Sequence, residues 1–541
     1  MQNNPTSNRY NDNNIIIIGA GASGIAMGCQ LQRKLGFKNF EIYERDDDFG
    51  GTWLVNTYPG SGCDIPSHFY SFSFENNPNW TKMFSLQPEI LTYMKDVSNK
   101  YNLPAHTRFG MECVGSEWDK DQEKWTVTFK NVKTGEISQK ACKFLVFCSG
   151  PLSTPNPCPV PSAENFKGAI FHSQQWNHKA EINNKDVIVI GNGCSAAQFV
   201  PVILPQVKSL KQFIRSQHWI LQRENTEFSE RFKWMMRNIP GLLISFRYFL
   251  AGFIDIFFIA FRTKSGKWLR DMTSKDSLNF MKKAPEKYHP LLIPNFEIGA
   301  KRRILDAGYV ECLSDPKILL TDDPLVQIKE NSVLTKSGEE HKADVIVYAT
   351  GFQVRELFAH LSIKGRSGEE LRGRWKRQGG ARAYKGVMVA DFPNMFVTVG
   401  PNTGSGHYSI IFMAECNVEY ILRILKPFLR EKSGGVVEVT EEGERKDVEW
   451  VQTRLKDCIW SEGEAGWYAD KVTKHNPTVY PHYQMNYWWR TLAPKWPDFK
   501  VTGAVSMNAV KRSWNLNNVI LFVIVNCLII MFGLILKKLF F

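Results

Sequence analysis

Two glycine-rich loops constrain the fold of this chain more than any other feature. Each follows a run of aliphatic residues and opens a helical pattern: IIIIGAGASG occupies residues 15–24 and VIVIGNGCSA occupies residues 187–196. A strand, a glycine turn and a helix in this order begin a βαβ unit, whose helix N-terminus can bind a phosphate. With 541 residues, the chain is long enough for two or three domains. We therefore expect an α/β protein with two Rossmann-like, dinucleotide-binding domains.

The first loop predicts a site for a dinucleotide that carries no 2′-phosphate. Gly19 permits the tight turn, Gly21 lets the backbone approach a pyrophosphate, and Gly24 lets helix and strand pack closely. Glu44 ends the next strand, where a carboxylate can accept hydrogen bonds from ribose hydroxyls. Together with Ser23, these residues form the expected first cofactor site. The alternative is a glycine turn that serves packing alone.

The second loop differs in the residues that would face the ribose. Ala196 replaces the third glycine, which the packing position tolerates. No acid ends the following strand; Arg215 stands there instead, and its guanidinium can pair with a 2′-phosphate in a bidentate way. The second site should therefore prefer NADPH to NADH, unless Arg215 is a solvated surface residue. The expected contacts are Gly191, Gly193, Ser195, Ala196, Arg215 and Ser216.

Two dinucleotide sites in one chain imply electron transfer between them. FAD in the first site and NADPH in the second is the simplest assignment. A flavin that passes electrons to a dithiol needs two cysteines close to it, but the sequence contains no CxxC or CxxxxC. Dioxygen is therefore the expected acceptor. The eleven cysteines show no zinc spacing and suit a reducing compartment, and we expect no metal site.

The formal net charge is +13. A basic chain can bind nucleic acid, but no recognition motif accompanies the charge here, and we expect no nucleic-acid partner. An anionic membrane surface is the better candidate. The uncharged run at the C-terminus, described below, supports it. Residues 240–261 are also strongly apolar and are interrupted only by Arg247 and Asp255. We expect a buried helix there or, as the second choice, a helix that docks on a membrane.

The C-terminus predicts a membrane anchor. Residues 519–536 form an uncharged run of 18 residues, with two basic residues on each side. A helix of that length spans roughly 27 Å, close to the thickness of the endoplasmic reticulum bilayer. We expect a transmembrane tail at 516–541 that holds the catalytic part on the cytosolic side of that membrane. A buried helix of a soluble protein is the alternative.

The proline-rich segment PLSTPNPCPVP at 151–161 predicts a linker, because proline at this density excludes helix. We therefore place the first part of the FAD-binding domain at 1–155. The NADPH-binding domain follows at 156–342, with a helical insertion at about 228–290. The second part of the FAD-binding domain and the C-terminal region occupy 343–510.

The segment FKGAIFHSQQWN at 166–177 has the pattern Phe-x-Gly-x-x-x-His-x-x-x-Trp. It resembles the fingerprint of the Baeyer–Villiger monooxygenases, class B flavoprotein monooxygenases related to the flavin-containing monooxygenases. GAGASG, YERDDDFGGTW, YPGSGCDIPSHFYSFSF, GNGCSA, GAKRRILDAGY and YATGF follow the order of that family, so the resemblance covers residues from about 12 to about 500. In the family this segment is the hinge between the FAD and NADPH domains.

The resemblance implies roles for single residues. Arg302 matches the active-site arginine, Lys301 a lysine near the 2′-phosphate of NADP, and His172 the hinge histidine, for which structural support and direct chemistry are both open. Residues expected along the flavin are Gly51, Thr52, Trp53, Asp64 and Tyr70. The chain departs from the family at Asn177, where proline or aspartate is usual, and at Arg303, where proline is usual.

The reaction implied by the resemblance begins with reduction of FAD by NADPH and formation of a C4a-peroxyflavin with O2. The peroxyflavin inserts one oxygen atom into a ketone, giving an ester or lactone. Arg302 would stabilise the anion and Asp64 would orient Arg302. The apolar helix and tail lead us to expect a small lipophilic substrate taken from membrane lipid. An N- or S-oxygenase of the same fold and a membrane-tethered flavin-binding protein without turnover remain alternatives.

Overall fold

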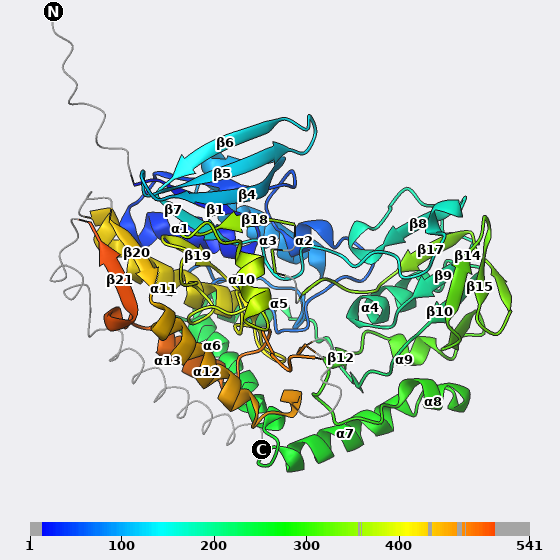
Figure 1. Cartoon of the computed structure of the whole chain (residues 1–541). Coiled ribbons are helices and arrows are strands. Elements are labelled where there is room, and N and C mark those ends of the chain that lie inside the picture. Colours follow the sequence, from blue (N-terminus) through cyan, green and yellow to red (C-terminus); the bar gives the residue numbers. More distant parts are fainter. Residues whose placement is uncertain are drawn as a thin grey trace, which may run out of the picture.

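The computed structural model describes residues 13–503, apart from 355–356, 359, 431–434, 462–467 and 471. Two parallel sheets lie side by side, one at the left and one at the right of Figure 1, and a set of helices runs beneath both. The transmembrane tail predicted for 516–541 lies outside the described residues. The two sheets are the frame on which the cofactor loops sit.

The first sheet contains the first glycine loop. Its strand order is β19-β7-β1-β2-β3, all parallel. The strands are β1 (Ile15–Ile18), β2 (Phe40–Tyr43), β3 (Thr107–Arg108), β7 (Phe144–Phe147) and β19 (Met395–Val397). Helix α1 (Ala22–Leu35) follows β1 as predicted and ends at Gly36 in the left-handed conformation. The long helix α11 (Ile410–Arg430) packs against α1 and completes the core of this domain.

The second sheet contains the second glycine loop. Its strand order is β13-β10-β9-β17-β8, also parallel. The strands are β8 (Ala169–His172), β9 (Asp186–Ile190), β10 (Ser209–Phe213), β13 (Ile318–Thr321) and β17 (Val345–Tyr348), and α4 (Cys194–Ile203) follows β9. Because β17 pairs with both β9 and β8, the predicted boundary at residue 343 is too early. The chain returns to the first sheet only at β19.

Smaller elements surround the two sheets. Strands β5 (Lys124–Asn131) and β6 (Ile137–Cys142) form an antiparallel hairpin that turns at Thr134 and Gly135, beside β4 (Met111–Asp119) and β18 (Ser362–Lys364). Other strands are β11 (Ile220–Leu221), β12 (Ile304–Leu305), β14 (Leu325–Ile328), β15 (Ser332–Thr335), β16 (Glu340–Lys342), β20 (Val436–Val439) and β21 (Phe499–Thr502). Other helices are α2 (Thr52–Val55), α3 (Gln87–Lys100), α9 (Tyr309–Cys312), α10 (Leu371–Arg377), α12 (Glu441–Leu455) and α13 (Gln484–Thr491).

The chain crosses between the two sheets twice, and the crossings are bonded to each other. The outward crossing leaves β7 and reaches β8, while the return crossing leaves β17. The amide of Asn156 donates to the carbonyl of Gly351 over 2.9 Å, and the amide of Gln353 donates to the carbonyl of Thr154 over 3.0 Å. The side chain of Asn156 adds a bond to the carbonyl of Thr350 at 2.9 Å. The predicted linker is therefore a paired, two-stranded connection.

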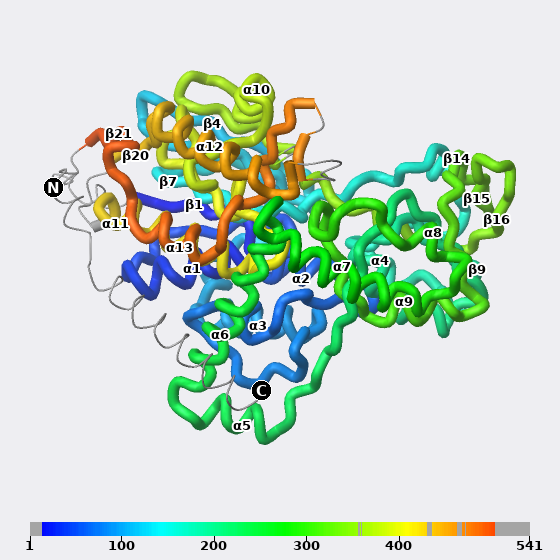
Figure 2. The backbone as a smooth tube through the Cα atoms, turned by 90° about the horizontal axis from the view of Figure 1, so that it is seen from below, coloured from blue at the N-terminus to red at the C-terminus, as the bar shows by residue number. Residues whose placement is uncertain are grey.

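Helices α5 (Glu230–Asn238), α6 (Leu242–Ile256), α7 (Lys267–Met281) and α8 (His289–Leu292) fall in the range predicted for a helical insertion. A 3-10 helix, η4 (Phe257–Phe261), continues α6. Figure 2 shows this green segment passing beneath the first domain and then beneath the second. Residues 242–261 form the one helix among the described residues that is long and apolar enough to cross a membrane, and only 28% of its apolar window is buried. The expectation of a buried helix is therefore wrong.

Candidate functional site

Some glycines of the two loops are required by close backbone contacts, whereas others face open space. Gly19 and Gly191 have φ of +105° and +107°, and a Cβ atom on either would lie 2.7 Å or 2.6 Å from a backbone oxygen. A Cβ on Gly24 would lie 1.9 Å from the carbonyl oxygen of Gly19. The fold itself therefore requires these three glycines. At Gly193, in contrast, a Cβ would meet nothing within 4 Å.

The open space at Gly193 is the kind that a ligand would occupy. Gly193 precedes the first residue of α4 and has extended backbone, and Gly21 precedes α1 in the same conformation. A Cβ on Gly21 would make only an ordinary contact of 3.5 Å with Gly51. Since neither glycine is demanded by the protein's own packing, both positions fit the close approach of a pyrophosphate to a helix N-terminus.

A cavity runs along the first loop and fits a flavin dinucleotide. Its wall includes the loop, the end of β2, the turn before α2 and the start of α11. Several residues predicted from the sequence line it, namely Gly19, Gly21, Ser23, Glu44, Gly51, Thr52, Trp53 and Tyr70. The cavity also includes Gln174 of the 166–177 segment, and Met111, Cys113 and Val399, which no local motif indicated.

Glu44 is buried at the end of this cavity, with 7% of its surface exposed. One carboxylate oxygen accepts from the amide of Ala20 at 2.6 Å, and the other accepts from the amide of Asp46 at 3.1 Å. Burial raises the pKa of the Glu44 carboxyl above its ordinary value. Each oxygen keeps a further lone pair, so the group can also accept from ribose hydroxyls.

The turn before α2 holds two aromatic side chains against the cavity. Gly51 has φ of +51°, and a Cβ there would lie 2.8 Å from the Cα of Gly21, so this turn packs directly on the first loop. The indole nitrogen of Trp53 donates to the hydroxyl of Tyr70 at 3.1 Å. Both side chains are nearly buried. They form a rigid wall beside the place predicted for the flavin.

The second loop is tied to the residues that follow β10. The side-chain amide of Asn192 donates to the carbonyl of Ser216 at 3.0 Å. Arg215 lies exposed beside Ser216, and among the described residues no ion pair reaches it. Ala196 is fully buried against the sheet, as its packing role predicts. Ser195 interacts with the hydroxyl of Tyr58, whose pKa is raised by burial.

Arg302 and Asp64 meet where the two domains face each other. The guanidinium Nη2 of Arg302 donates to the carboxylate Oδ2 of Asp64 in a close ion pair. The negative charge of Asp64 is the main cause that raises the pKa of Arg302. Both side chains stay partly exposed, with 37% and 31% of their surfaces accessible. The two side chains therefore form a charged ion pair that a ligand can reach.

The loop that carries Asp64 is held against the second domain. The hydroxyl of Tyr58 donates to the side chain of Gln198 on α4 at 2.8 Å. The side-chain amide of Gln198 donates in turn to the carbonyl of Gly62 at 3.0 Å. A Cβ on Gly60 would lie 2.6 Å from the carbonyl oxygen of Gln198, which requires glycine at that close approach. These contacts bring Asp64 to Arg302 across 238 residues of sequence.

Three other residues around Arg302 were not predicted from the sequence. The thiol of Cys194 interacts with Arg302 at the start of α4. Burial raises the pKa of the Tyr468 hydroxyl to about 12, and the positive charge of Arg302 opposes that rise. Arg223 is a partly buried residue whose guanidinium donates to the carbonyl of Cys63 at 3.3 Å. Cys194 follows Gly193 directly and could have been found from its place in the motif; Tyr468 and Arg223 belong to no pattern.

His172 lies at the end of β8, away from the Arg302 pair. Its Nδ1 accepts from the amide of Gln174 at 3.0 Å, and its ring stands edge-on to Tyr348 and Phe352. Burial lowers the pKa of His172 to about 4, so the ring is neutral. Among the described residues it forms no hydrogen bond with Arg302 or Asp64. The geometry fits the hinge interpretation better than direct chemistry.

The rest of the 166–177 segment serves packing. A Cβ on Gly168 would lie 2.3 Å from the carbonyl oxygen of Asp344, so glycine is required where this segment passes β17. The ring of Trp176 packs on Phe171 at 5.3 Å and on Phe199 at 5.2 Å. Because Phe199 belongs to α4, the segment fixes the helix that presents the second loop.

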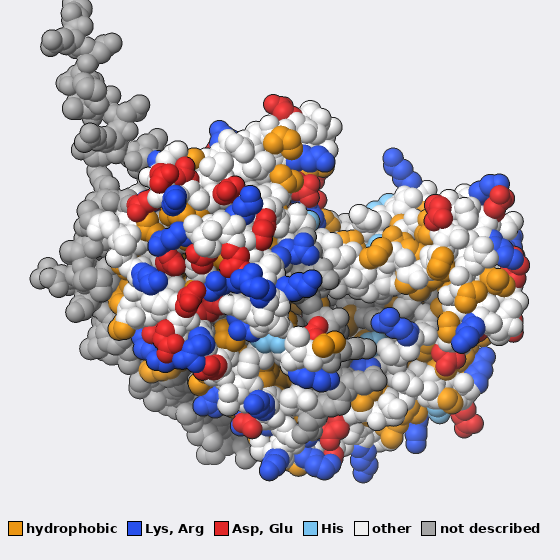
Figure 3. Space-filling model, viewed as in Figure 1, with side chains coloured by type: hydrophobic (Ala, Val, Ile, Leu, Met, Phe, Trp, Pro, Cys, Tyr) orange, Lys and Arg blue, Asp and Glu red, His pale blue; other side chains and the backbone are white. Residues whose placement is uncertain are grey.

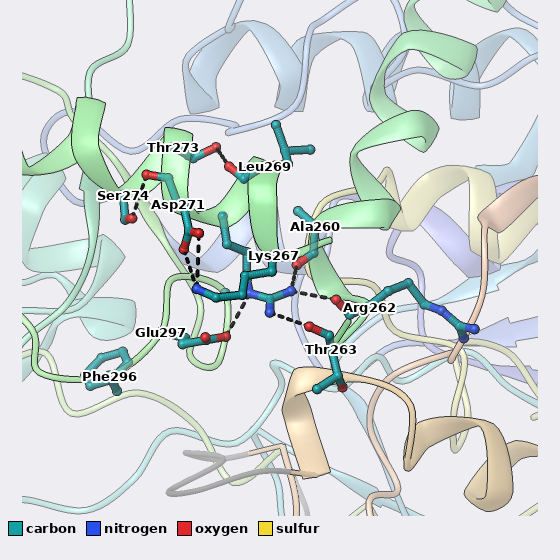
Figure 4. Close-up of polar contacts among 12 residues, drawn as sticks. Ala260, Arg262, Thr263, Lys267, Leu269, Asp271, Thr273, Ser274, Phe296 and Glu297 are labelled. Carbon is teal, nitrogen blue, oxygen red and sulfur yellow. Dashed lines mark hydrogen bonds and ion pairs between the residues drawn. The ribbon is translucent and has the colours of Figure 1, made fainter. Parts of the chain in front are cut away.

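Contacts around Phe296 and Glu297 also hold the loop that carries Arg302. Lys301 lies 4.4 Å over the ring of Phe296. Glu297 forms an ion pair of 2.8 Å with the buried Arg270 of α7. Arg270 also donates to three backbone oxygens around the end of η4, those of Ala260, Arg262 and Thr263. Figure 4 shows these contacts converging from η4 and from the segment before the loop.

The arrangement has clear relatives among known proteins. The family model described as flavin-binding monooxygenase-like matches residues 12–371. The chain belongs to this family. It is 33% identical over 484 residues to a Baeyer–Villiger monooxygenase of Pseudomonas aeruginosa, covering 89% of this chain and 90% of that one. A Baeyer–Villiger monooxygenase of Streptomyces coelicolor is 32% identical, with 86% and 88% covered.

Solved structures in the family share the fold. A steroid monooxygenase bound to NADP superposes with a TM-score of 0.79 at 23% identity, covering 91% of this chain and 99% of the other. A closed form of cyclohexanone monooxygenase gives a TM-score of 0.78 at 24% identity, with the same coverage. The predicted family and the two-domain α/β architecture are thus confirmed.

Proposed function

We propose that this family member is an FAD-dependent, NADPH-consuming monooxygenase that inserts one oxygen atom of O2 into a ketone. The observation that carries the proposal is the Arg302–Asp64 ion pair, which lies beside Cys194 of the second dinucleotide loop. The named relatives support it, since two of them are Baeyer–Villiger monooxygenases. When bound, the flavin supplies the redox chemistry and NADPH supplies the hydride.

The residues present would hold both cofactors. Glu44 and the first loop fit the adenosine part and the pyrophosphate of FAD, with Thr52, Trp53 and Tyr70 along the rest of the molecule. The second loop fits the pyrophosphate of NADPH, and the exposed Arg215, together with Ser216 and Lys301, fits its 2′-phosphate. We assign these roles on the chemistry of the groups and on the open space at Gly21 and Gly193.

Arg302 would stabilise negative charge that develops on oxygen during the reaction. Its charge is secured, because Asp64 raises the pKa of the guanidinium. Asp64 also fixes the direction in which the guanidinium points, so little reorganisation is needed when charge develops. The second face of Arg302 contacts Cys194, whose thiol is neutral because burial raises its pKa. Asp64 is therefore the anion that balances Arg302 at this place.

We propose a lipophilic substrate and a membrane location. The support is the uncharged run at 519–536 and the mostly unburied apolar helix at 242–261. The tail would anchor the chain in a bilayer, with the endoplasmic reticulum as the expected membrane and the catalytic part in the cytosol. The substrate class follows from this location, since a ketone dissolved in lipid would be concentrated beside the protein.

The experiment is a product analysis with the purified full chain, FAD and NADPH. Steroid and long-chain ketones, a tertiary amine and a sulfide are incubated under isotopically labelled dioxygen. The expected result is an ester or lactone carrying one labelled oxygen, with NADPH consumption matched to product. Oxidation of the amine or sulfide alone would assign the chain to the N- or S-oxygenating branch. A chain that binds no FAD, or that releases only hydrogen peroxide, would overturn the proposal.

A further inference from the structure

Exposed apolar side chains gather on one part of the molecule. The described residues include 17 large hydrophobic side chains that are exposed, and eight of them lie between residues 234 and 272. We call these eight the insertion surface. They are Trp234, Ile239, Ile244, Tyr248, Phe253, Ile256, Trp268 and Met272. Single exposed hydrophobic residues are ordinary, but a contiguous set on neighbouring helices marks an interaction site.

Helix α6 buries its two charged residues and exposes large apolar residues on the opposite face. Arg247 and Asp255 are only 4% exposed, on the face that also buries Leu250 and Ala251. The opposite face carries Phe253 and Ile256, which are 51% and 64% exposed. A surface helix of a water-soluble domain has the reverse pattern. The outward face of α6 is therefore suited to an apolar environment.

Buried polar contacts fix this orientation. Arg247 donates to the carbonyl of His68 at 3.1 Å and to the hydroxyl of Ser71 at 2.9 Å, and it pairs with Glu415 at 3.6 Å. Asp255 accepts from two backbone amides at the start of α13, those of Gln484 at 2.7 Å and Met485 at 3.0 Å. Rotation of α6 would leave these charges buried without partners, which is costly. The apolar face cannot turn inward.

The surroundings of the insertion surface are basic. Apart from the buried Arg247, Arg270 and Asp255, residues 228–290 contain ten Lys and Arg but only four Asp and Glu. Figure 3 shows Lys and Arg along the lower rim of the molecule, where α7 runs in Figure 1. Trp234 and Trp268 stand on the helices before and after α6, and tryptophan is enriched where protein meets the headgroup layer. Apolar side chains, tryptophans and a basic rim together match an anionic lipid surface.

We propose that the insertion surface docks on an anionic bilayer. Its apolar side chains enter the interface, and the basic rim contacts lipid phosphates. This contact is separate from the tail anchor, and it does not depend on the oxygenation chemistry. The stretch between residues 503 and 519 can extend over about 50 Å, so the tail and the insertion surface can reach the same bilayer.

Docking here would bring lipid close to the Arg302 loop. The exposed Ile256 ends α6, and η4 follows with five residues, a rise of about 10 Å. At its end, the ring of Phe261 lies 5.3 Å from the guanidinium of Arg303 and 4.8 Å from the ring of Trp460. Helix η4 therefore connects the insertion surface with the segment that carries Arg302.

The test measures vesicle binding by the full chain. Ile529→Lys and Ile530→Lys first charge the tail run, so that the tail no longer binds lipid. Flotation then uses phosphatidylcholine vesicles, with and without about 30% phosphatidylserine. Adding Phe253→Glu and Ile256→Glu should lower the partition coefficient on the anionic vesicles at least about tenfold, because apolar burial is lost. The control is Val132→Glu with Ile137→Glu, two exposed residues on the β5–β6 hairpin, which should change binding less than about twofold.

Three results would overturn the proposal. The tail-charged parent fails to bind either vesicle, the two glutamate pairs lower binding equally, or the Phe253 and Ile256 pair leaves binding unchanged. Sedimentation velocity adds a further outcome, since a dimer that only this pair dissociates would make a second copy the occupant. Phe253→Ser with Ile256→Ser repeats the test without added charge, and thermal melting establishes that each variant is folded.

Discussion

Among the described residues, Arg302 pairs with one carboxylate, that of Asp64, and the charge balance of the candidate site depends on that contact. Replacing Arg302 with alanine leaves Asp64 without its partner and removes the donor for developing charge. We expect the rate of oxygen insertion to fall about 100-fold or more. Flavin reduction by NADPH should change far less, because the second loop and Arg215 are untouched.

Stopped-flow absorbance separates the two steps, and Arg302→Lys tests whether charge alone suffices. A lysine cannot reproduce the planar guanidinium contact, so it should recover only part of the rate. Equal losses in flavin reduction and oxygen insertion would show that Arg302 supports NADPH binding or folding instead.

Arg215 should determine the choice between NADPH and NADH. It lies exposed beside Ser216 at the end of β10, where a 2′-phosphate would receive its guanidinium. Arg215→Ala should lower the preference for NADPH over NADH, measured as the ratio of kcat/KM values, by about tenfold or more. Lys211→Ala on the same strand is the control and should leave the ratio unchanged. A ratio unaffected by Arg215→Ala would place the 2′-phosphate elsewhere.

Among single residues, the sequence predicted the roles of those that lie in recognisable motifs. Gly19, Gly24 and Gly191 are required by close backbone contacts, which the strand–loop–helix order implies. The Arg302–Asp64 contact came from resemblance, since nothing in the local sequence joins residues so far apart. Tyr468 could not be predicted, because its position beside Arg302 depends on the packing of a segment that has no periodicity.

Among the secondary-structure elements, α12 contains a buried acid whose charge costs stability. Glu444 is 3% exposed, and burial raises its pKa to about 7. The folded-state pKa lies above the unfolded value, so the stability from this site is present below about pH 4.5 and is lost as pH rises through 7. The total loss is about 3 kcal/mol.

Glu444→Gln should remove this pH dependence. Between pH 5 and 8, the melting temperature of the wild type should fall relative to that of the variant, since glutamine never ionises. Glu449→Gln, on the exposed side of the same helix, is the control and should follow the wild type. Parallel curves for the wild type and Glu444→Gln would mean that the carboxyl is already ionised in the folded protein at low pH.

Helices and strands with a clear hydrophobic period were predicted well. The elements against which they pair or pack were not. Strand β1 and helix α1, and strand β9 and helix α4, occur where the pattern placed them. The aliphatic run of β17 carries no mark of which sheet it joins, and the boundary at 343 was wrong for that reason. Helix α6 was expected to be buried because its composition is apolar, whereas its two charged residues face inward.

For the whole molecule, the tail predicts a location that can be measured. If residues 519–536 span a bilayer, Ile529→Lys with Ile530→Lys should move most of the chain from the membrane pellet to the carbonate-soluble fraction of cells. The reason is that two charges at the centre of a run this short oppose insertion. Lys537→Ala with Lys538→Ala is the control and should leave the chain in the pellet. Carbonate extraction of the unaltered chain would contradict the anchor.

The paired crossing between the two sheets limits how one domain can turn against the other. A single connecting segment would allow one domain to twist in every direction against the other. Two connecting segments that are hydrogen-bonded side by side at Asn156 and Gly351 act as a hinge and restrict that twisting. The helical insertion adds a second connection, since Arg247 of α6 donates to the carbonyl of His68 whereas Met281 and Leu292 pack in the core of the second domain. Two separate connections favour a single relative orientation of the domains, the one in which Arg302 meets Asp64.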